Sequence, residues 1–210
     1  MEITSTERNK RNKDRLSVYI DGRFSFTISE EDFISLHLYE KTEITEETIE
    51  YIKNTLNFRE AKAKAVRYLS LRIRTEKEVL EKLLNQGYDQ DCASKVIDEL
   101  KAIGYINNKL YAQKYIFDRS KLKPLSRKMM KLELMSKGIP EDIVDEVLTD
   151  YKVEDSIVAE RLLKSKFGKY DLNEEKTLRK AYMFLAHRGF SSSTIKAAIR
   201  DLGAHIDDET

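Results

Sequence analysis

The feature that most constrains this chain is a helix-breaking glycine that returns at a fixed interval. Gly87, Gly138 and Gly189 lie 51 residues apart, each between two stretches with the apolar spacing of a helix. A supersecondary unit that recurs every 20 to 50 residues or so indicates a stack of similar repeats. We therefore predict three copies of one helical unit, with the first, second and third repeats at residues 57–106, 107–157 and 158–210.

Each of these glycines is expected to end a helix by adopting a positive φ, where a side chain would clash. In that kind of helix end, the residue after the glycine packs on the residue five positions before it. The pairs are apolar in every copy, namely Tyr88 with Leu83, Ile139 with Leu134, and Phe190 with Leu185. Asp89 and Ser191 are suitable N-caps for the next helix, and Pro140 replaces the cap in the middle copy.

The helix before each glycine also has a predicted start. Thr75, Ser126 and Thr177 share one register of the repeat, and hydroxyl side chains are good N-caps. Thr75 and Glu78 have the spacing of a capping box. Three weakly similar stretches are thus expected to share one local design.

Residues 1–56 differ from the repeats and are predicted to form a β-hairpin with a helical extension. Apolar residues alternate on both sides of Asp21 and Gly22, first Leu16, Val18 and Ile20, then Phe24, Phe26 and Ile28. A two-residue loop would pair Ile20 with Arg23 and place the two apolar sets on opposite faces, so we expect a connection of odd length. Ser29 and Thr45 are predicted to cap short helices in an acidic segment that we interpret as a solvated face.

Composition narrows the class of protein. Charged residues make up 36% of the chain and there are two prolines, which favours helices. A single cysteine excludes an internal disulfide framework. There is no long apolar run and no signal-peptide pattern, so we expect a cytoplasmic protein without membrane contact.

The residue pattern does not favour an enzyme. The seven glycines form neither G-x-x-x-x-G-K nor G-x-G-x-x-G, so no phosphate-binding loop is expected. His37, His187, His205 and Cys92 are scattered and show no metal-ligand spacing or nucleophile–base pairing. We therefore predict no catalytic residues, no metal site and no cofactor.

Charge distribution favours a binding role instead. Residues 116–137 hold seven Lys or Arg against two acids, and residues 139–155 hold seven acids against one Lys. Among positions related by the 51-residue period, only Lys77, Lys128 and Arg179 are basic in every copy. Stacked repeats would align them as a basic row suited to an acidic protein groove or to phosphates. Further basic residues could widen it: Arg72, Arg74, Arg119, Lys121, Lys123 and Arg127.

Four segments carry a resemblance to a known family: "YLSLRIRTEKEVLEKLLNQGY" (68–88), "LKAIGYINNKLYAQKYIFDRS" (100–120), "KLELMSKGI" (131–139) and "AYMFLAHRGFSSSTIKAAI" (181–199). In order and spacing the chain resembles the RecX family, regulators of the RecA recombinase, over roughly residues 58–203. The resemblance implies a mainly α fold of three tandem three-helix repeats in an elongated, curved array. Asn108 departs from the acidic cap frequent in the family, but asparagine caps a helix nearly as well.

The resemblance also implies a function in DNA repair, homologous recombination and the SOS response. It implies binding in the groove of the RecA–DNA filament, with hindered filament growth, ATP hydrolysis, strand exchange and co-protease action. The alternative is a helical repeat protein that binds nucleic acid by itself, with the hairpin as a wing and "ERNKRNKDR" as a basic arm. We expect a monomer whose main partner is the RecA filament and which binds single- or double-stranded DNA weakly.

Overall fold

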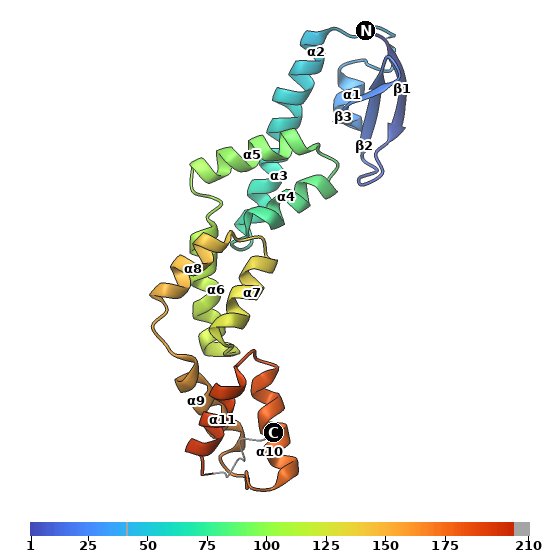
Figure 1. Cartoon of the computed structure of the whole chain (residues 1–210). Coiled ribbons are helices and arrows are strands. Elements are labelled where there is room, and N and C mark those ends of the chain that lie inside the picture. Colours follow the sequence, from blue (N-terminus) through green and yellow to red (C-terminus); the bar gives the residue numbers. More distant parts are fainter. Residues whose placement is uncertain (41, 204–210) are drawn as a thin grey trace. The chain divides into compact units, whose positions relative to one another are not determined.

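The structure is a computed structural model that describes residues 1–40 and 42–203. Three strands come first and are followed by helices to the end of the described chain (Figure 1). The elements are β1 (Ile3–Arg8), β2 (Arg15–Ile20), β3 (Arg23–Ser29), α1 (Glu30–Ser35), α2 (Glu46–Tyr51), the π-helix η1 (Ile52–Asn57), α3 (Phe58–Ser70), α4 (Glu76–Asn85), α5 (Gln90–Ala102), α6 (Asn108–Leu122), α7 (Arg127–Ser136), α8 (Glu141–Asp150), α9 (Asp155–Phe167), α10 (Glu175–Ala186) and α11 (Ser192–Asp201). The predicted class, mainly helical with an N-terminal hairpin and three three-helix repeats, is confirmed.

The chain divides into two compact units, Met1–Asn107 and Asn108–Thr210. The first unit holds the sheet, α1, α2, η1 and the helices α3 to α5. The second holds α6 to α11. The repeat boundaries given above and the elongated, curved arrangement of the repeats stay predictions.

The predicted hairpin is present, but its connection is not of odd length. Asp21 and Gly22 form a two-residue loop with φ of 47° and 78°, and Ile20 pairs with Arg23. The odd residue is supplied by a bulge in β3 instead. Tyr19 pairs with Phe24 while Val18 pairs with Phe26, which leaves Ser25 as the extra residue. The bulge moves Phe24 to the outer face and returns Phe26 to the buried face, so the expected apolar face forms by a different route.

A third strand, β1, was not predicted. It pairs antiparallel with β2 at the edge of the sheet, in the order β1-β2-β3. The segment interpreted as a basic arm therefore begins inside a strand. It ends at Arg15, the first residue of β2. The loop between the two strands is held to the first repeat, where Arg11 Nη1 donates to Leu84 O (3.3 Å) and Asn12 Nδ2 donates to Gln86 O (3.0 Å). A free basic arm is excluded for these residues.

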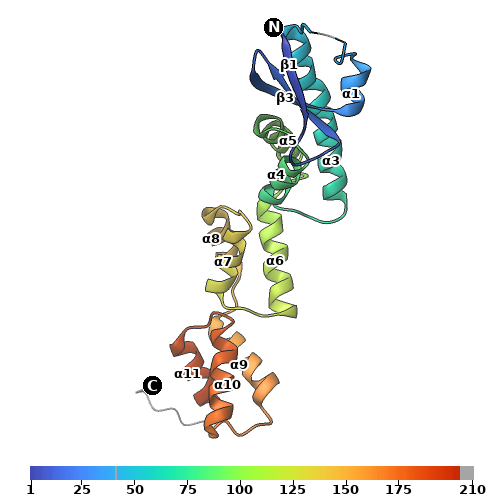
Figure 2. The same cartoon turned by 90° about the vertical axis from the view of Figure 1, so that its right-hand side faces the viewer.

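The sheet shares one long helix with the first repeat. Ser29 and Thr45 cap α1 and α2 as predicted, and α2 continues without a break through η1 into α3. Ile49, Ile52 and Leu56 on this helix complete the core beneath the sheet, whereas Ala61 and Ala65 belong to the core of the first repeat. Figures 1 and 2 both show the sheet beside this helix.

The predicted glycine turns are confirmed in all three repeats. Gly87, Gly138 and Gly189 have φ between 81° and 86°. The amide of the following residue donates to the carbonyl five positions earlier in each copy, with the closing bonds Tyr88–Leu83, Ile139–Leu134 and Phe190–Leu185 at 3.2–3.4 Å. All six of these residues are buried, so each turn contributes to the separate core of its own repeat.

The predicted helix starts are confirmed in two repeats and wrong in the third. Thr75 and Ser126 are N-caps, and Thr75 forms a complete capping box with Glu78. In the third repeat α10 begins at Glu175, so Thr177 lies inside the first turn. Its hydroxyl donates to the Glu174 carboxylate (2.8 Å) instead of capping. Glu174 and Glu175 favour this earlier start because acidic side chains suit the positive end of a helix.

The third glycine turn lies against the second repeat, inside the second compact unit. The amide of Ser126 donates to Arg188 O (3.0 Å). A Cβ added at Gly189 would lie 2.7 Å from Ser126 Oγ and 2.8 Å from Met129 Cβ. This turn therefore needs glycine both for its φ and for a close contact between neighbouring repeats.

Candidate interaction surface

The structure places Lys77, Lys128 and Arg179 on the second helix of each repeat, and all three side chains are exposed. Lys77 and Lys128 are the second residues of α4 and α7. Arg179 is the fifth residue of α10, because that helix starts earlier than predicted. The three residues thus match in sequence register, while Arg179 lies about one turn further along its helix.

Lys77 and Lys128 occupy positions where folding does not favour a cation. The first turn of a helix is the positive end of its dipole, and a basic side chain there is disfavoured by about 0.3–1 kcal/mol at an exposed site. Helix propensity does not require lysine at these positions either. The helix dipole and helix propensity therefore do not account for a basic residue at these two positions.

Three of the residues that were expected to widen the basic row make contacts within the fold. The Arg74 guanidinium lies 3.9 Å from the centre of the Tyr68 ring, and its side chain is 11% exposed. Arg119 pairs with Glu133 (2.9 Å) and its Nε donates to Tyr115 Oη (2.8 Å). The Arg127 guanidinium donates to the carbonyls of Leu148 and Tyr151 at the end of α8. Cations near a helix C-terminus stabilise its unpaired carbonyls, so this arginine has a structural role.

The other three residues that were expected to widen the basic row are exposed. Arg72 pairs with Glu78 (2.7 Å) at an exposed side-chain fraction of 51%. Burial alone would raise the pKa of Glu78, but the amide of Thr75 and the Arg72 guanidinium lower it. Lys121 lies over the Phe117 ring at 3.8 Å, and Lys123 is exposed beside it. The exposed basic candidates are therefore Lys77 and Arg72 in the first unit, and Lys128, Arg179, Lys121 and Lys123 in the second.

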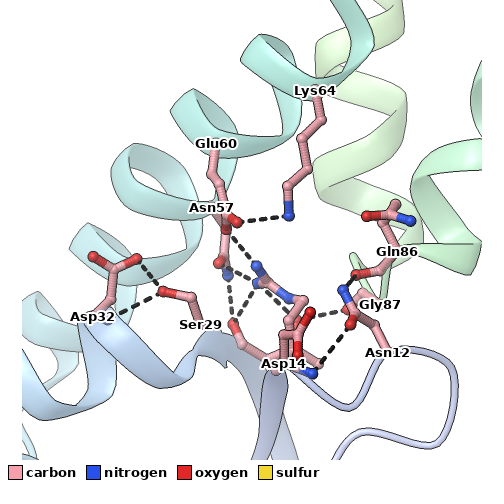
Figure 3. Close-up of polar contacts among 11 residues, drawn as sticks. Asn12, Asp14, Ser29, Asp32, Asn57, Glu60, Lys64, Gln86 and Gly87 are labelled. Carbon is pink, nitrogen blue, oxygen red and sulfur yellow. Dashed lines mark hydrogen bonds and ion pairs between the residues drawn. The ribbon is translucent and has the colours of Figure 1, made fainter. Parts of the chain in front are cut away.

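A buried polar junction in the first unit was missed by the sequence analysis. The Arg15 side chain is 1% exposed and forms an ion pair with Glu60. The Glu60 carboxylate also contacts Lys64 (Figure 3). Arg15 Nη2 also donates to Asn57 Oδ1 (2.6 Å) and to Thr27 Oγ1 (3.2 Å), and its guanidinium lies 4.2 Å from the centre of the Tyr88 ring. One arginine thus joins the sheet, the long helix and the first glycine turn.

Further bonds link the other polar groups of this junction, although Arg15 Nε is buried without a hydrogen-bond partner. Asn57 Nδ2 donates to Thr27 O (2.6 Å), and the Thr27 hydroxyl donates to Gly87 O (2.8 Å). Lys64 pairs with Glu60 at 2.8 Å. Burial by itself would raise the pKa of Glu60, but Lys64 and Arg15 hold it below its ordinary value. Alternation along β2 places Arg15 and Leu16 on opposite faces, but the local sequence does not reveal that a second element covers the face of Arg15.

Other chemistry is sparse in the part of the chain that the structure describes. No group of three His, Cys, Asp or Glu side chains there could hold a metal ion. His37 and His187 are exposed and Cys92 is buried, while His205 lies outside the described residues. Burial raises the pKa of the Cys92 thiol to about 12. None of the described helices has the length and apolar character needed to cross a membrane.

Comparison with known proteins gives one consistent family. Models described as "Regulatory protein RecX N-terminal domain" and as the first, second and third three-helix domains of RecX match residues 1–45, 61–100, 107–148 and 155–199, respectively. The chain is 30% identical to Regulatory protein RecX of Clostridium botulinum strain Eklund 17B, over 95% of each chain. It is 31% identical to the protein of the same name from Clostridium beijerinckii, over 99% of each chain.

Solved structures are similar as well. A crystal structure of regulatory protein RecX matches with a TM-score of 0.62 and 26% identity, covering 95% of this chain and 98% of that one. A crystal structure of RecX from Lactobacillus salivarius matches with a TM-score of 0.57 and 28% identity, covering 70% of this chain and 96% of the other.

Proposed function

This chain belongs to the RecX family of regulatory proteins, and we propose on that basis that it regulates the RecA recombinase, mainly as an inhibitor. In this proposal it binds in the groove of the RecA–DNA filament in the cytoplasm, without catalysing a reaction itself. It would thereby hinder filament growth, ATP hydrolysis, strand exchange and co-protease action. Through these steps it would affect homologous recombination, DNA repair and the SOS response.

The observation that carries the proposal for the binding face is the exposed basic residue near the start of each second helix. Lys77 and Lys128 are basic against the preference of the helix dipole, and Arg179 keeps the same sequence register. Charged side chains of this kind set the specificity and rate of association with a partner of opposite charge. An acidic groove on a protein filament is a partner of that kind.

The test is ATP hydrolysis by the cognate recombinase on single-stranded DNA, measured with and without this protein. We expect the wild-type chain to suppress hydrolysis and the triple variant Lys77→Glu, Lys128→Glu, Arg179→Glu to lose most of that suppression. The variant should fold normally, because exposed charges contribute little to stability and an acid in the first turn suits the helix dipole.

A matched control reverses three exposed basic residues of the N-terminal sheet and its β1–β2 loop: Lys10→Glu, Lys13→Glu and Arg23→Glu. It changes the net charge by the same amount, so it separates a specific face from a general loss of positive charge. We expect the control to suppress hydrolysis as the wild type does. Full suppression by the triple variant would place the binding face elsewhere, and no effect of the wild-type chain would refute the proposed function.

A further inference from the structure

The third repeat carries a group of basic side chains that its own carboxylates do not neutralise. Six exposed residues lie between the end of α9 and the middle of α10: Lys164, Lys166, Lys169, Lys176, Arg179 and Lys180. Within the described residues, none of these six forms an ion pair. In the earlier repeats Lys62, Lys101, Lys109 and Lys131 are each paired with a carboxylate.

Four of these six cations line two adjoining hollows. Lys176, Arg179, Lys180 and Met183 follow the i, i+3, i+4, i+7 spacing of one helix face and line an open hollow of about 490 Å³ with Glu175. A second hollow, of about 430 Å³, shares Lys176 and Lys180 with the first. Its other wall comes from the end of α9 and the turn after it: Lys166, Phe167 and Tyr170. The two helices lie together within the third repeat (Figures 1 and 2).

Tyr170 adds an aromatic surface to this group of cations. Its side chain is 65% exposed, and its ring meets Phe167 edge-on with the ring centres 6.3 Å apart. The core of the repeat is filled by other residues, including Leu172 and Phe190. Lys166 lies over the Phe184 ring at 4.3 Å, which holds its stem against the repeat while the side chain remains exposed. A solvent-exposed aromatic ring among lysines suits a nucleic acid strand, because bases stack on the ring and the lysines attract the phosphates.

Two of the three nearby carboxylates accept hydrogen bonds from neighbouring residues of the same loop and helix. Asp171 Oδ1 accepts from the amide of Asn173 (2.9 Å), and the Glu174 carboxylate accepts from the Thr177 hydroxyl (2.8 Å). Glu175 lines the first hollow and Glu174 lines the second, so three cations face one carboxylate in each. Both hollows are therefore predominantly basic, and the second also contains the Tyr170 ring.

We propose that the third repeat binds a single strand of nucleic acid across Lys166, Tyr170, Lys176 and Lys180. The three lysines would contact phosphates, and a base would stack on the Tyr170 ring. A duplex keeps its bases paired and stacked, so it would use the lysines but not the ring. An acidic protein segment would likewise need the charges alone. This site adds to the proposed regulatory function and does not depend on it.

The test uses the full chain without a recombinase. Fluorescence anisotropy of a labelled oligodeoxythymidylate of about 20 nucleotides, longer than typical sites of roughly 4–16, reports binding at low salt. Lys166→Glu, Lys176→Glu and Lys180→Glu together should weaken binding at least about tenfold and should make log Kd less dependent on log salt by about 2, as expected for three phosphate contacts. Arg179 is left intact, so that suppression of the recombinase can be scored separately in the same variant.

Two further variants make the test specific. The control Lys10→Glu, Lys13→Glu and Arg23→Glu carries the same charge change and should bind within about twofold of the wild type, because none of these residues belongs to the third repeat and exposed charges outside a site act mainly through screened fields. Tyr170→Ala should weaken binding by about fivefold or more, whereas Tyr170→Phe should keep most of it, because stacking needs the ring and not the hydroxyl. Thermal melting of each variant checks that the repeat is folded.

Several outcomes would overturn the proposal. The wild-type chain could fail to bind the oligonucleotide at low salt, or the control could lose as much affinity as the lysine variant. A duplex bound more tightly than the single strand, with Tyr170→Ala unchanged, would indicate a charge-only contact with double-stranded DNA. Equal competition by a polyglutamate peptide, again insensitive to Tyr170→Ala, would indicate an acidic protein partner.

Discussion

Replacing Arg15 with methionine should destabilise the first compact unit strongly, although the change keeps much of the side-chain volume. Removing one partner of a buried ion pair costs about 3–5 kcal/mol, because the other partner stays behind without compensation. Here Glu60 keeps Lys64 at 2.8 Å and is 29% exposed, which moves its share toward the lower end. Asn57 Oδ1, on a residue that is 1% exposed, loses its arginine donor, which adds about 1–3 kcal/mol.

These terms overlap, so we expect a total loss of about 3–5 kcal/mol in the free energy of unfolding. With a urea dependence of about 2–3 kcal/mol/M, the midpoint should fall by roughly 1–2.5 M. Amide exchange of residues 15–29 and 52–65 should accelerate by a matching factor. Arg23→Met, an exposed arginine of the same sheet, serves as control and should stay within about 0.5 kcal/mol of the wild type.

The pH dependence gives a second measurement of the same junction. The pKa of Glu60 is lower in the folded state than its ordinary value, so its carboxylate stabilises the fold above about pH 4.3, and this contribution is lost as pH falls through the folded pKa. Arg15→Met should flatten that acid loss. The reasoning about the buried ion pair would be refuted if the free energy of unfolding of Arg15→Met lay within about 1 kcal/mol of the wild-type value and fell with decreasing pH in the same way.

Two further predictions concern the glycine turn of the third repeat and the cysteine. Gly189→Ala should lower the free energy of unfolding by at least about 2 kcal/mol, because it adds a clash with Ser126 to a strained φ. The control Gly104→Ala, where φ is 79° and no atom lies nearby, should lower it by about 1 kcal/mol. Equal losses in urea unfolding would argue against the contact between repeats. The buried Cys92 thiol, with its pKa raised to about 12, should resist iodoacetamide at pH 8 and react readily in urea; fast alkylation of the native chain, followed by mass spectrometry, would contradict its burial.

Features set by a few neighbouring residues could be predicted from the sequence. The turns at Gly87, Gly138 and Gly189 depend on one residue with positive φ and one apolar pair, and both are visible in a short segment. The capping box of Thr75 and Glu78 is equally local. Repetition at a fixed interval made the signal of the glycine turns stronger than it would be in a single copy.

Features that depend on distant partners could not be predicted in the same way. Strand β1 is a polar segment without the alternating apolar pattern of a half-buried strand, so its pairing with β2 could not be predicted. The spacing of the apolar residues in the hairpin requires one extra residue, but it does not show that this residue is Ser25 in a bulge. Arg15 becomes a core residue only because another element covers its face. For the candidate site, searching for positions that are basic in every copy identified Arg179 but not Lys166 and Lys180, which belong to a group of cations in one repeat only.

The buried arginine also affects how the chain folds while it is being translated. Arg15 and Thr27 belong to strands that leave the ribosome early, but their partners Asn57, Glu60 and Tyr88 follow much later. At 5–20 residues per second, the segment from the end of β3 to Tyr88 takes about 3 to 12 s to translate. Before these residues emerge, the Arg15 guanidinium lacks its Glu60 partner and the face of the sheet that carries it is uncovered. Completion of the N-terminal fold is therefore tied to translation of the first repeat.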